Sequence, residues 1–258
     1  MKTFRPFSIA AVRGRAAFTL LELAVVLAMI ALLATISVPA LAGTKSQTRV
    51  AQCAGNLKQY AMALHMFGSE NNDKLPVNSG GFGSWAWDMA WITGNSITQY
   101  VSFREMYCPG TSVRFTDQDN ANLWNWSPGN LHVVGYVAPI PSSPFSSPII
   151  ATNLNTTLTP QRIQVGSVFL PAPSPAARVL VADATISTGT SDNHAGFVAG
   201  AKYNFTSVVG GYSVPHISPH LNGLTPAGGN LAMLDGHVTW RNFSDMDQRA
   251  ITGIGFWW

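Results

Sequence analysis

Two cysteines carry the most reactive side chains of this 258-residue chain. A disulfide between Cys53 and Cys108 would close a loop of roughly 55 residues, and a loop of that size stabilises a fold by about 4 kcal/mol on the chain-entropy account. We expect this disulfide if the domain lies outside the cytoplasm, where such bonds persist. Two free buried thiols are the alternative.

Histidines and aspartates form a second group that folding could gather around a metal ion. Their spacing contains no His-x-x-x-His and no paired-cysteine pattern of the kind that zinc sites use. Residues 117–120 are rich in oxygen donors but lack the later glycine and acid of a calcium-binding EF-hand loop, so we expect a polar turn there. We therefore predict no metal ligands; the side chains considered are His194, His216, His220, His237, Asp183, Asp192 and Asp235.

Motifs of known catalytic chemistry are missing from the sequence. It has no Gly-x-Ser-x-Gly elbow, no phosphate-binding loop and no dinucleotide-binding fingerprint. Cys53 and Cys108 are poor candidates for a nucleophile in an exported domain. The sequence accordingly predicts no catalytic residue, no cofactor and no enzymatic activity.

Glu22 is a single carboxylate at the head of an apolar run. No ionisable side chain occurs from Leu23 to Gly43, and a helix of that length rises about 31 Å, enough to cross a bilayer. The run predicts a transmembrane segment over residues 18–42. A carboxylate beside such a segment is costly in lipid, so we expect Glu22 to have a function.

Basic residues are concentrated before this run. Lys2, Arg5, Arg13 and Arg15 lie in the first seventeen residues, which contain no acid. The rest of the chain has 11 basic and 12 acidic residues, so the net charge of +3 belongs to the N-terminus and nucleic-acid binding is not expected. Basic residues that flank an apolar span stay in the cytoplasm. We therefore expect a cytoplasmic N-terminus, a single pass through the cytoplasmic (inner) membrane, and an extracytoplasmic domain of residues 43–258.

Two cleavage sites compete near the N-terminus. Ala40-Leu41-Ala42 before Gly43 is a small-x-small site, and a cut after Ala42 would release a soluble secreted protein. The second site lies between Ala17 and Phe18, at the start of the apolar run. A signal peptide gains nothing from an acid at the start of its apolar core, and this favours the second site.

Phe18-Thr19-Leu20-Leu21-Glu22 resembles the mature N-terminus of type IV pilins and type II secretion pseudopilins. The resemblance implies that residues 1–17 are a leader that prepilin peptidase removes, and that the new amine of Phe18 is methylated. It also implies that Glu22 meets the N-terminal ammonium of a neighbouring subunit and so sets the register of assembly. The family usually has glycine where this chain has Ala17. The implied partners are prepilin peptidase, other pilin or pseudopilin subunits and the inner membrane.

Further segments resemble bacterial prepilin-type proteins that end in a histidine, nine residues and Asp-Gly. These segments are residues 53–59, 107–109 and 178–183. In the terminal region of this chain, His220 is followed by fourteen residues and then by Asp235-Gly236. Because this spacing departs from the family pattern, the resemblance assigns no metal or contact role to His220.

One helix is expected from residue 18 to residue 71, about 80 Å long, because Val50, Cys53, Leu57, Ala61 and Leu64 recur at steps of three or four. Strands are expected at residues 131–137, 179–182 and 202–209. Residues 230–234 and 237–243 flank Asp235-Gly236 and predict a β-hairpin with a type I′ turn. The expected fold class is α+β: a long, pilin-like N-terminal transmembrane helix packed on a loop-rich globular domain with an antiparallel β-sheet.

These features together predict a structural subunit of a type II secretion or type IV pilus-like filament. Two other hypotheses stay open: a binding protein that the pilin-like anchor displays, and the soluble protein cut after Ala42. In the first of these, aromatic loops at residues 85–91 or 124–126 would contact the ligand. The aromatic tail Phe256-Trp257-Trp258 either packs at the edge of the core or forms a contact surface.

Overall fold

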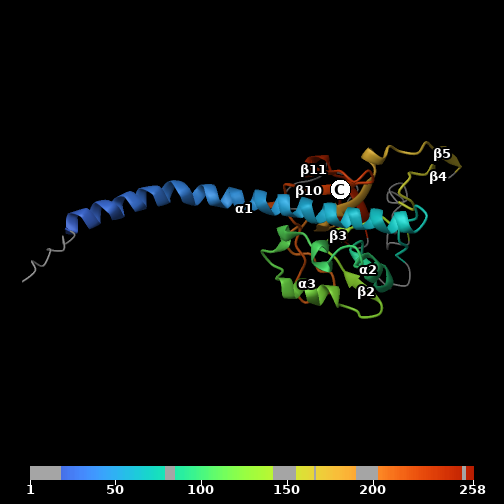
Figure 1. The fold of residues 1–258 in the computed structure, drawn as a ribbon, viewed down its shortest axis with the longest axis horizontal. Helices are drawn as coiled ribbons and strands as arrows, with labels where there is room; N and C mark the ends of the chain where they lie inside the picture. Colours follow the sequence, from blue (N-terminus) through green and yellow to red (C-terminus); the bar gives the residue numbers. More distant parts are fainter. Residues whose placement is uncertain (1–18, 79–84, 142–154, 166, 190–202, 252–253) are drawn as a thin grey trace, which may run out of the picture. The chain divides into compact units, whose positions relative to one another are not determined.

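A computed structural model of the chain describes residues 19–78, 85–141, 155–165, 167–189, 203–251 and 254–258, with the backbone alone at 34–44, 163–165 and 249–251. The chain divides into two compact units, Met1–Lys45 and Ser46–Trp258, here called the N-terminal unit and the globular unit. Figure 1 gives the order of the helices and strands along the chain.

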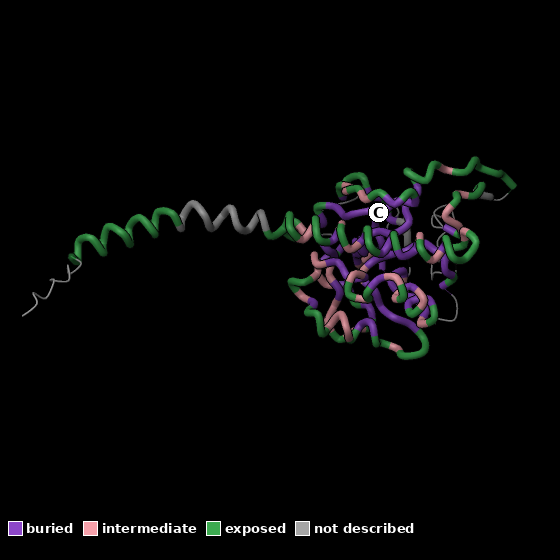
Figure 2. Tube along the Cα trace, in the orientation of Figure 1, coloured by how far each residue is buried: buried purple, intermediate pink, exposed green. Residues whose placement is uncertain are grey.

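Helix α1 (Leu20–Glu70) has 51 residues and contributes to both units. Its backbone is helical through Pro39, as one continuous element. In the N-terminal unit, ten large apolar side chains between Leu20 and Leu33 are 45% to 86% exposed, and this stretch appears as exposed helix in Figure 2. The described side chains from Leu20 to Leu33 are therefore mostly exposed apolar surface.

The prediction of a transmembrane helix over residues 18–42 is wrong. Across the described residues, no helix combines the length and the hydrophobicity that a membrane crossing requires. The fold class is α+β with antiparallel sheets, without the membrane-spanning element that the sequence led us to expect.

The second half of α1 supplies one wall of the core of the globular unit. Cys53, Leu57, Ala61 and Leu64 are each fully buried, as their spacing predicted. Tyr60 and Ala63 widen the buried stripe, whereas Met62 is 50% exposed. The helix ends at Glu70, one residue before the predicted end, and Asn72 and Asp73 adopt positive φ angles of 55° and 67° in the turn that follows.

The main sheet is antiparallel, in the order β11-β10-β6-β3. Its strands are β3 (Tyr136–Val137), β6 (Val179–Asp183), β10 (Gly228–Met233) and β11 (Val238–Asn242). All residues of β6 and β10 are buried, which explains the continuous apolar run of β6 up to Ala182 and confirms the strand predicted at 179–182. Helix α1 contacts this sheet directly, because Asn230 Nδ2 of β10 donates to the carbonyl oxygen of Val50 at 3.3 Å.

The predicted hairpin is confirmed, and its predicted turn type is wrong. Strands β10 and β11 pair with Ala232 opposite Val238. Beyond this pair, Met233 N donates to the carbonyl oxygen of His237 and Gly236 N donates to that of Met233, both at 2.8 Å. Gly236 has a φ of +85°, but Asp235 is not among the described residues with positive φ. A type I′ turn needs positive φ at both central residues, so the connection is a three-residue loop in which Gly236 alone takes the left-handed conformation.

A second antiparallel sheet, in the order β12-β13-β7, contains the C-terminal tail. Its strands are β7 (Thr185–Thr188), β12 (Gln248–Ile251) and β13 (Ile254–Trp257). Phe256, Trp257 and Trp258 are all at most 1% exposed. The aromatic tail is therefore part of the core and not a contact surface.

Short elements complete the globular unit. The strand predicted at 131–137 is split into β2 and β3, and residues 203–209 make only isolated bridges through Asn204 and Val208, while Lys202 lies outside the described residues. The stretch predicted as a polar turn opens helix α3, where Thr116 and Asp119 form a capping box. The remaining elements are β1 (Asp88–Ala90), α2 (Trp91–Ile97), η1 (Phe103–Met106), η2 (Pro109–Thr111), α3 (Asp117–Trp124), β2 (Leu131–Val133), β4 (Ile163–Val165), β5 (Val168–Leu170), η3 (Pro175–Ala177), β8 (Leu221–Asn222), β9 (Thr225–Pro226) and η5 (Phe243–Asp245).

Candidate functional site

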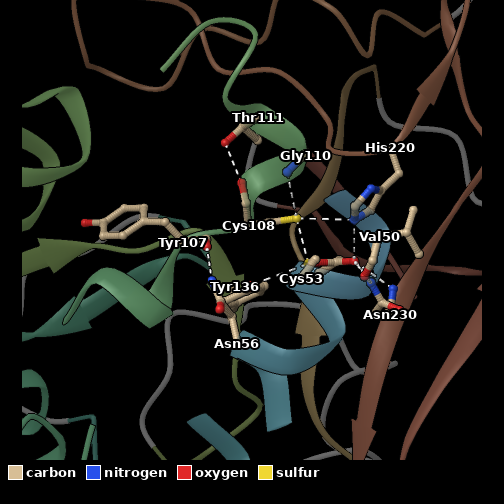
Figure 3. A network of polar contacts seen from close by, with 11 residues as sticks. Val50, Cys53, Asn56, Tyr107, Cys108, Gly110, Thr111, Tyr136, His220 and Asn230 are labelled. Carbon is tan, nitrogen blue, oxygen red and sulfur yellow. Dashed lines mark hydrogen bonds and ion pairs between the residues drawn. The ribbon is translucent and has the colours of Figure 1, made fainter. Parts of the chain in front are cut away.

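Four side chains from separate segments meet inside the globular unit. They are Cys53 of α1, Cys108 just before η2, Asp183 at the end of β6 and His220 just before β8. One donor atom from each lies within 4.8 Å of the donor atoms of the others, and all four residues are buried. Figure 3 shows Cys53, Cys108 and His220 of this cluster, here called the Cys–Asp–His cluster, facing one another.

Short contacts link the four donors in a ring. Cys108 Sγ lies 2.6 Å from Cys53 Sγ, which lies 2.8 Å from Asp183 Oδ1. His220 Nε2 lies 3.2 Å from Cys108 Sγ and 3.4 Å from Asp183 Oδ2. The same nitrogen of His220 therefore faces both a sulfur and a carboxylate oxygen.

The structure brings Cys53 and Cys108 together, as the sequence predicted, but holds them as free thiols. The disulfide itself remains a prediction. Sequence reasoning considered Asp183 and His220 for a metal but did not place them with the two cysteines, because the four residues meet only through the fold. The one signal was local: Asp183 ends a continuous apolar strand, where a buried carboxylate needs a partner.

A second layer of polar groups surrounds the four donors. Asn230 donates to Asp183 Oδ2 twice, from its backbone N at 2.6 Å and from Nδ2 at 3.4 Å. Gly110 N donates to Cys108 Sγ at 3.4 Å, and the Tyr136 hydroxyl lies 3.4 Å from Cys53 Sγ. Burial, with the charge of Asp183 as a further cause, raises the pKa of Tyr136 well above its usual range, so this hydroxyl keeps its proton and can donate.

The protonation states follow from burial and from the partners. Burial, the hydrogen bond with Cys53 and the charge of Asp183 all raise the pKa of the Cys108 thiol. Burial lowers the pKa of His220, but the hydrogen bond to Asp183 opposes it, and the net result is a rise to about 10. With the four residues alone, His220 is thus an imidazolium beside Asp183, and Cys108 is a neutral thiol.

This arrangement differs from a catalytic Cys-His-Asp triad. In a triad, the nucleophile and the orienting carboxylate contact opposite nitrogens of the imidazole, whereas here both lie against Nε2. A nucleophilic cysteine also needs a lowered pKa and access to substrate, whereas Cys108 is 2% exposed and its pKa is raised. The geometry suits a binding cluster better than a nucleophile.

The backbone around His220 is shaped to bring its ring into the cluster. His220 has a φ of +54°, a left-handed conformation that non-glycine residues seldom adopt. Gly110 packs against it so closely that a Cβ there would lie 2.9 Å from Pro219 Cβ and 3.0 Å from His220 Cε1. A side chain at position 110 would therefore push His220 away from Cys108.

The other residues of the predicted terminal motif lie apart from the cluster. Asp235 and Gly236 form the hairpin turn, where Asp235 Oδ1 is 2.6 Å from His237 Nδ1 in an exposed pair. The carbonyl oxygen of Gly236 accepts a 2.5 Å hydrogen bond from Lys58 Nζ. His220 is separated from this turn by the β8–β9 hairpin, which accounts for the long spacing.

Glu22 caps the start of α1. Its Oε2 accepts hydrogen bonds from Thr19 N and Thr19 Oγ1, both at 2.9 Å, and Glu22 N donates to Thr19 Oγ1 at 3.2 Å. This reciprocal pattern is a capping box, a role that sequence reasoning missed although Thr-x-x-Glu is its signature. The two bonds from Thr19 lower the pKa of Glu22, so the side chain is a carboxylate at neutral pH. Ala17 and Phe18, the predicted cleavage residues, lie outside the described residues.

Most aromatic residues proposed for ligand contact serve the core. Trp87 is 2% exposed and stacks on His216 with ring centroids 4.3 Å apart. Trp91 and Trp124 stack on the ring of His132, with centroids 4.3 Å and 3.7 Å away. Trp126 is the exception, at 45% exposure.

Of the histidines and aspartates considered for a metal, His194 and Asp192 lie outside the described residues, and only His220 and Asp183 enter the cluster.

Sequence and structure were compared with what is known of other proteins. Comparisons with protein-family models, with curated proteins and with solved structures found no match. The resemblance to type IV pilins therefore rests on the N-terminal residues themselves, and the function is argued from the chain.

Proposed function

We propose that this chain is a pilin-like structural subunit that assembles with further copies through the apolar half of α1. Prepilin peptidase would cut between Ala17 and Phe18, and the new amine of Phe18 would be methylated. The observation that carries the proposal is the stretch from Leu20 to Leu33, with ten exposed large apolar side chains and one carboxylate.

The apolar surface surrounds the helix and does not form one stripe. Exposed side chains occur at consecutive positions such as Leu20 and Leu21, Val25 and Val26, and Leu32 and Leu33, which point in different directions around a helix. A single flat partner surface could cover only one side of such a helix. Several helices packed around it would cover all sides, as happens when copies of one subunit bundle together.

Charge favours a second copy of this chain as the occupant. Glu22 is the only ionisable side chain between Leu20 and Leu33, and a carboxylate in an apolar bundle is costly unless a cation lies beside it. Cleavage before Phe18 would create one ammonium on every copy, close in sequence to Glu22. Each subunit then carries one anion and one cation at the same end of α1, so neighbouring copies can neutralise each other.

The capping role of Glu22 is compatible with this pairing. Both bonds from Thr19 go to Oε2, and a carboxylate offers about four acceptor sites on its two oxygens. The cap fixes the carboxylate at the first turn of α1, so an ammonium from a neighbour would meet it in one defined position. That is a physical basis for register during assembly.

Photocrosslinking tests which surface joins the copies. A photoreactive phenylalanine analogue at position 27 replaces a leucine that is 57% exposed on α1, and the same analogue at position 113 replaces a valine that is 63% exposed on the globular unit. We expect irradiation of cells producing the full chain to give covalent dimers from position 27, with peptides of residues 20–33 of another copy attached, and few dimers from position 113. Capture of lipid or of an unrelated protein at position 27, without chain-to-chain products, would contradict the proposal.

A further inference from the structure

The Cys–Asp–His cluster has the donor set of a metal centre. Two sulfurs, one imidazole nitrogen and one carboxylate oxygen converge from Cys53, Cys108, His220 and Asp183, with each donor atom within 4.8 Å of the others. Thiolate, imidazole and carboxylate are the ligands of zinc in proteins, and four of them fill a tetrahedral site. We infer that these four side chains bind one divalent transition-metal ion of the zinc class.

The distances agree with a site that an ion would open slightly. Around a tetrahedral zinc ion at ordinary bond lengths, neighbouring donor atoms lie about 3.3 to 3.8 Å apart. The contacts from His220 Nε2, at 3.2 Å to Cys108 Sγ and 3.4 Å to Asp183 Oδ2, are already close to this spacing. The two sulfurs, 2.6 Å apart, would have to separate by about 1 Å to take their places around the ion.

The second layer is of the kind that orients metal ligands. Ligating carboxylates and thiolates are usually held by hydrogen bonds from neighbouring groups. Asn230 fixes Asp183 through two donors, and Gly110 N and Tyr136 supply one donor each toward Cys108 and Cys53. Each of the three anionic ligands therefore has a partner outside the site that stabilises its charged form.

A disulfide alone would use only two of the four groups. It would leave Asp183 and His220, 1% and 7% exposed, as a buried ion pair beside the sulfurs. A buried ion pair pays a desolvation penalty that the attraction between its two charges often fails to repay. Two thiolates and a carboxylate carry three negative charges, and a divalent ion reduces this net charge to minus one. Arg49, a cation, lines the same surface pocket as His220.

That pocket also gives an ion a way to the site. Ser46, Arg49, Gly110 and His220 are among the residues that line it, so it reaches the side of the cluster where His220 contacts Cys108. With four protein ligands, the site leaves no open position for a substrate, which is the pattern of structural zinc and not of catalytic zinc. The ion would tie α1 to β6 and to the loops before η2 and β8, independently of filament assembly.

Metal titration of the full chain tests the inference. The chain is purified with its thiols reduced and titrated first with Co²⁺, as a spectroscopic probe, and then with Zn²⁺. We expect one ion per chain, with the visible absorption of tetrahedral cobalt and the charge-transfer bands of cobalt–thiolate bonds. Replacement of the cobalt by zinc should remove both signals.

Variants distinguish this site from adventitious binding. Cys108→Ser and His220→Gln each remove a metal ligand, so each should weaken zinc binding by about a hundredfold or more. Loss of a group that only orients a ligand weakens metal binding by about 10- to 100-fold. His237→Gln is the matched control, because His237 also lies beside an aspartate, Asp235, but in an exposed pair; its affinity should equal that of the unchanged chain. Near-ultraviolet circular dichroism identifies any variant that fails to fold, and Asp183→Asn, with nearly the same shape, then serves as the second test.

Three results would overturn the inference. One is a reduced, folded chain that binds no Co²⁺ with tetrahedral spectra. Another is binding that Cys108→Ser, His220→Gln and Asp183→Asn leave unchanged. The third is a chain isolated from its natural compartment with Cys53 and Cys108 joined in a disulfide and no bound metal, which would assign the two sulfurs to the bond instead.

Discussion

Glu22→Gln should abolish filament assembly while leaving helix α1 intact. Glutamine at this position can still complete a capping box with Thr19, because the box accepts Glu or Gln. It cannot neutralise the ammonium of a neighbouring copy, and an unpaired charge in an apolar surround costs about 3 to 5 kcal/mol. This corresponds to a loss of assembly of about a hundredfold or more, measured as sedimentable or sheared filaments per cell at equal subunit levels.

Thr19→Ala is the matched control for this prediction. It keeps the carboxylate of Glu22 but removes Thr19 Oγ1, which both donates to Glu22 Oε2 and accepts from Glu22 N. Loss of a cap costs about 1 kcal/mol of helix stability, so assembly should persist at a level far above that of Glu22→Gln. If Glu22→Gln assembles normally, or if Thr19→Ala fails just as completely, Glu22 acts only as a cap.

Removal of the N-terminal unit should give a folded, monomeric protein. The boundary between the two compact units lies at Lys45 and Ser46, and the residues of the hydrophobic core begin at Cys53. A chain of residues 46–258 loses every exposed apolar side chain of the Leu20–Leu33 stretch but keeps the four residues of the Cys–Asp–His cluster. We expect a single monomeric species in analytical ultracentrifugation and a cooperative thermal transition.

The globular unit contains a rival surface that makes this truncation informative. In the β4–β5 hairpin, Val168, Phe169 and Leu170 are 58%, 64% and 42% exposed. If the fragment of residues 46–258 forms oligomers as extensive as those of the full chain, assembly depends on the globular unit and not on α1. Substitution of Phe169 by serine in the fragment would then show whether this hairpin is the contact.

Local patterns predicted the elements that depend on local physics. The spacing of Cys53, Leu57, Ala61 and Leu64 predicted both the helix and the face that it buries, because that spacing keeps side chains on one side of a helix. Asp-Gly between two strand-like runs predicted the β10–β11 hairpin. The predicted type I′ turn belongs to a two-residue loop, whereas this loop contains three residues. The sequence does not show at which pair of residues the two strands stop pairing, and this decides the loop length.

Predictions about the apolar N-terminus and the tail show what composition does not decide. The uncharged run from Leu23 to Gly43 predicted a membrane span that the described residues do not bear out. The tail residues Phe256, Trp257 and Trp258 left two readings open, and pairing of β13 with β7 and β12 resolved them in favour of the core. The case of the tail turns on what a segment packs against, which hydrophobicity alone does not specify.

The Cys–Asp–His cluster depended on contacts across long stretches of chain. Asp183 lies 130 residues from Cys53, and His220 lies 112 residues from Cys108. Spacing patterns for metal sites describe ligands that share a helix, a loop or a hairpin, whereas this cluster needs α1, β6 and two loops to meet. The prediction of no metal ligands followed from those patterns, and the fold gives the reason to revise it.

The mass and sequence of the mature N-terminus test the central claim most directly. Our account predicts that the chain isolated from its natural host begins at Phe18 and carries a methyl group on that amine. Such a chain retains Thr19, Glu22 and the exposed apolar stretch through Leu33. A chain that begins at Gly43 would have lost all of these, and it would contradict assembly through α1.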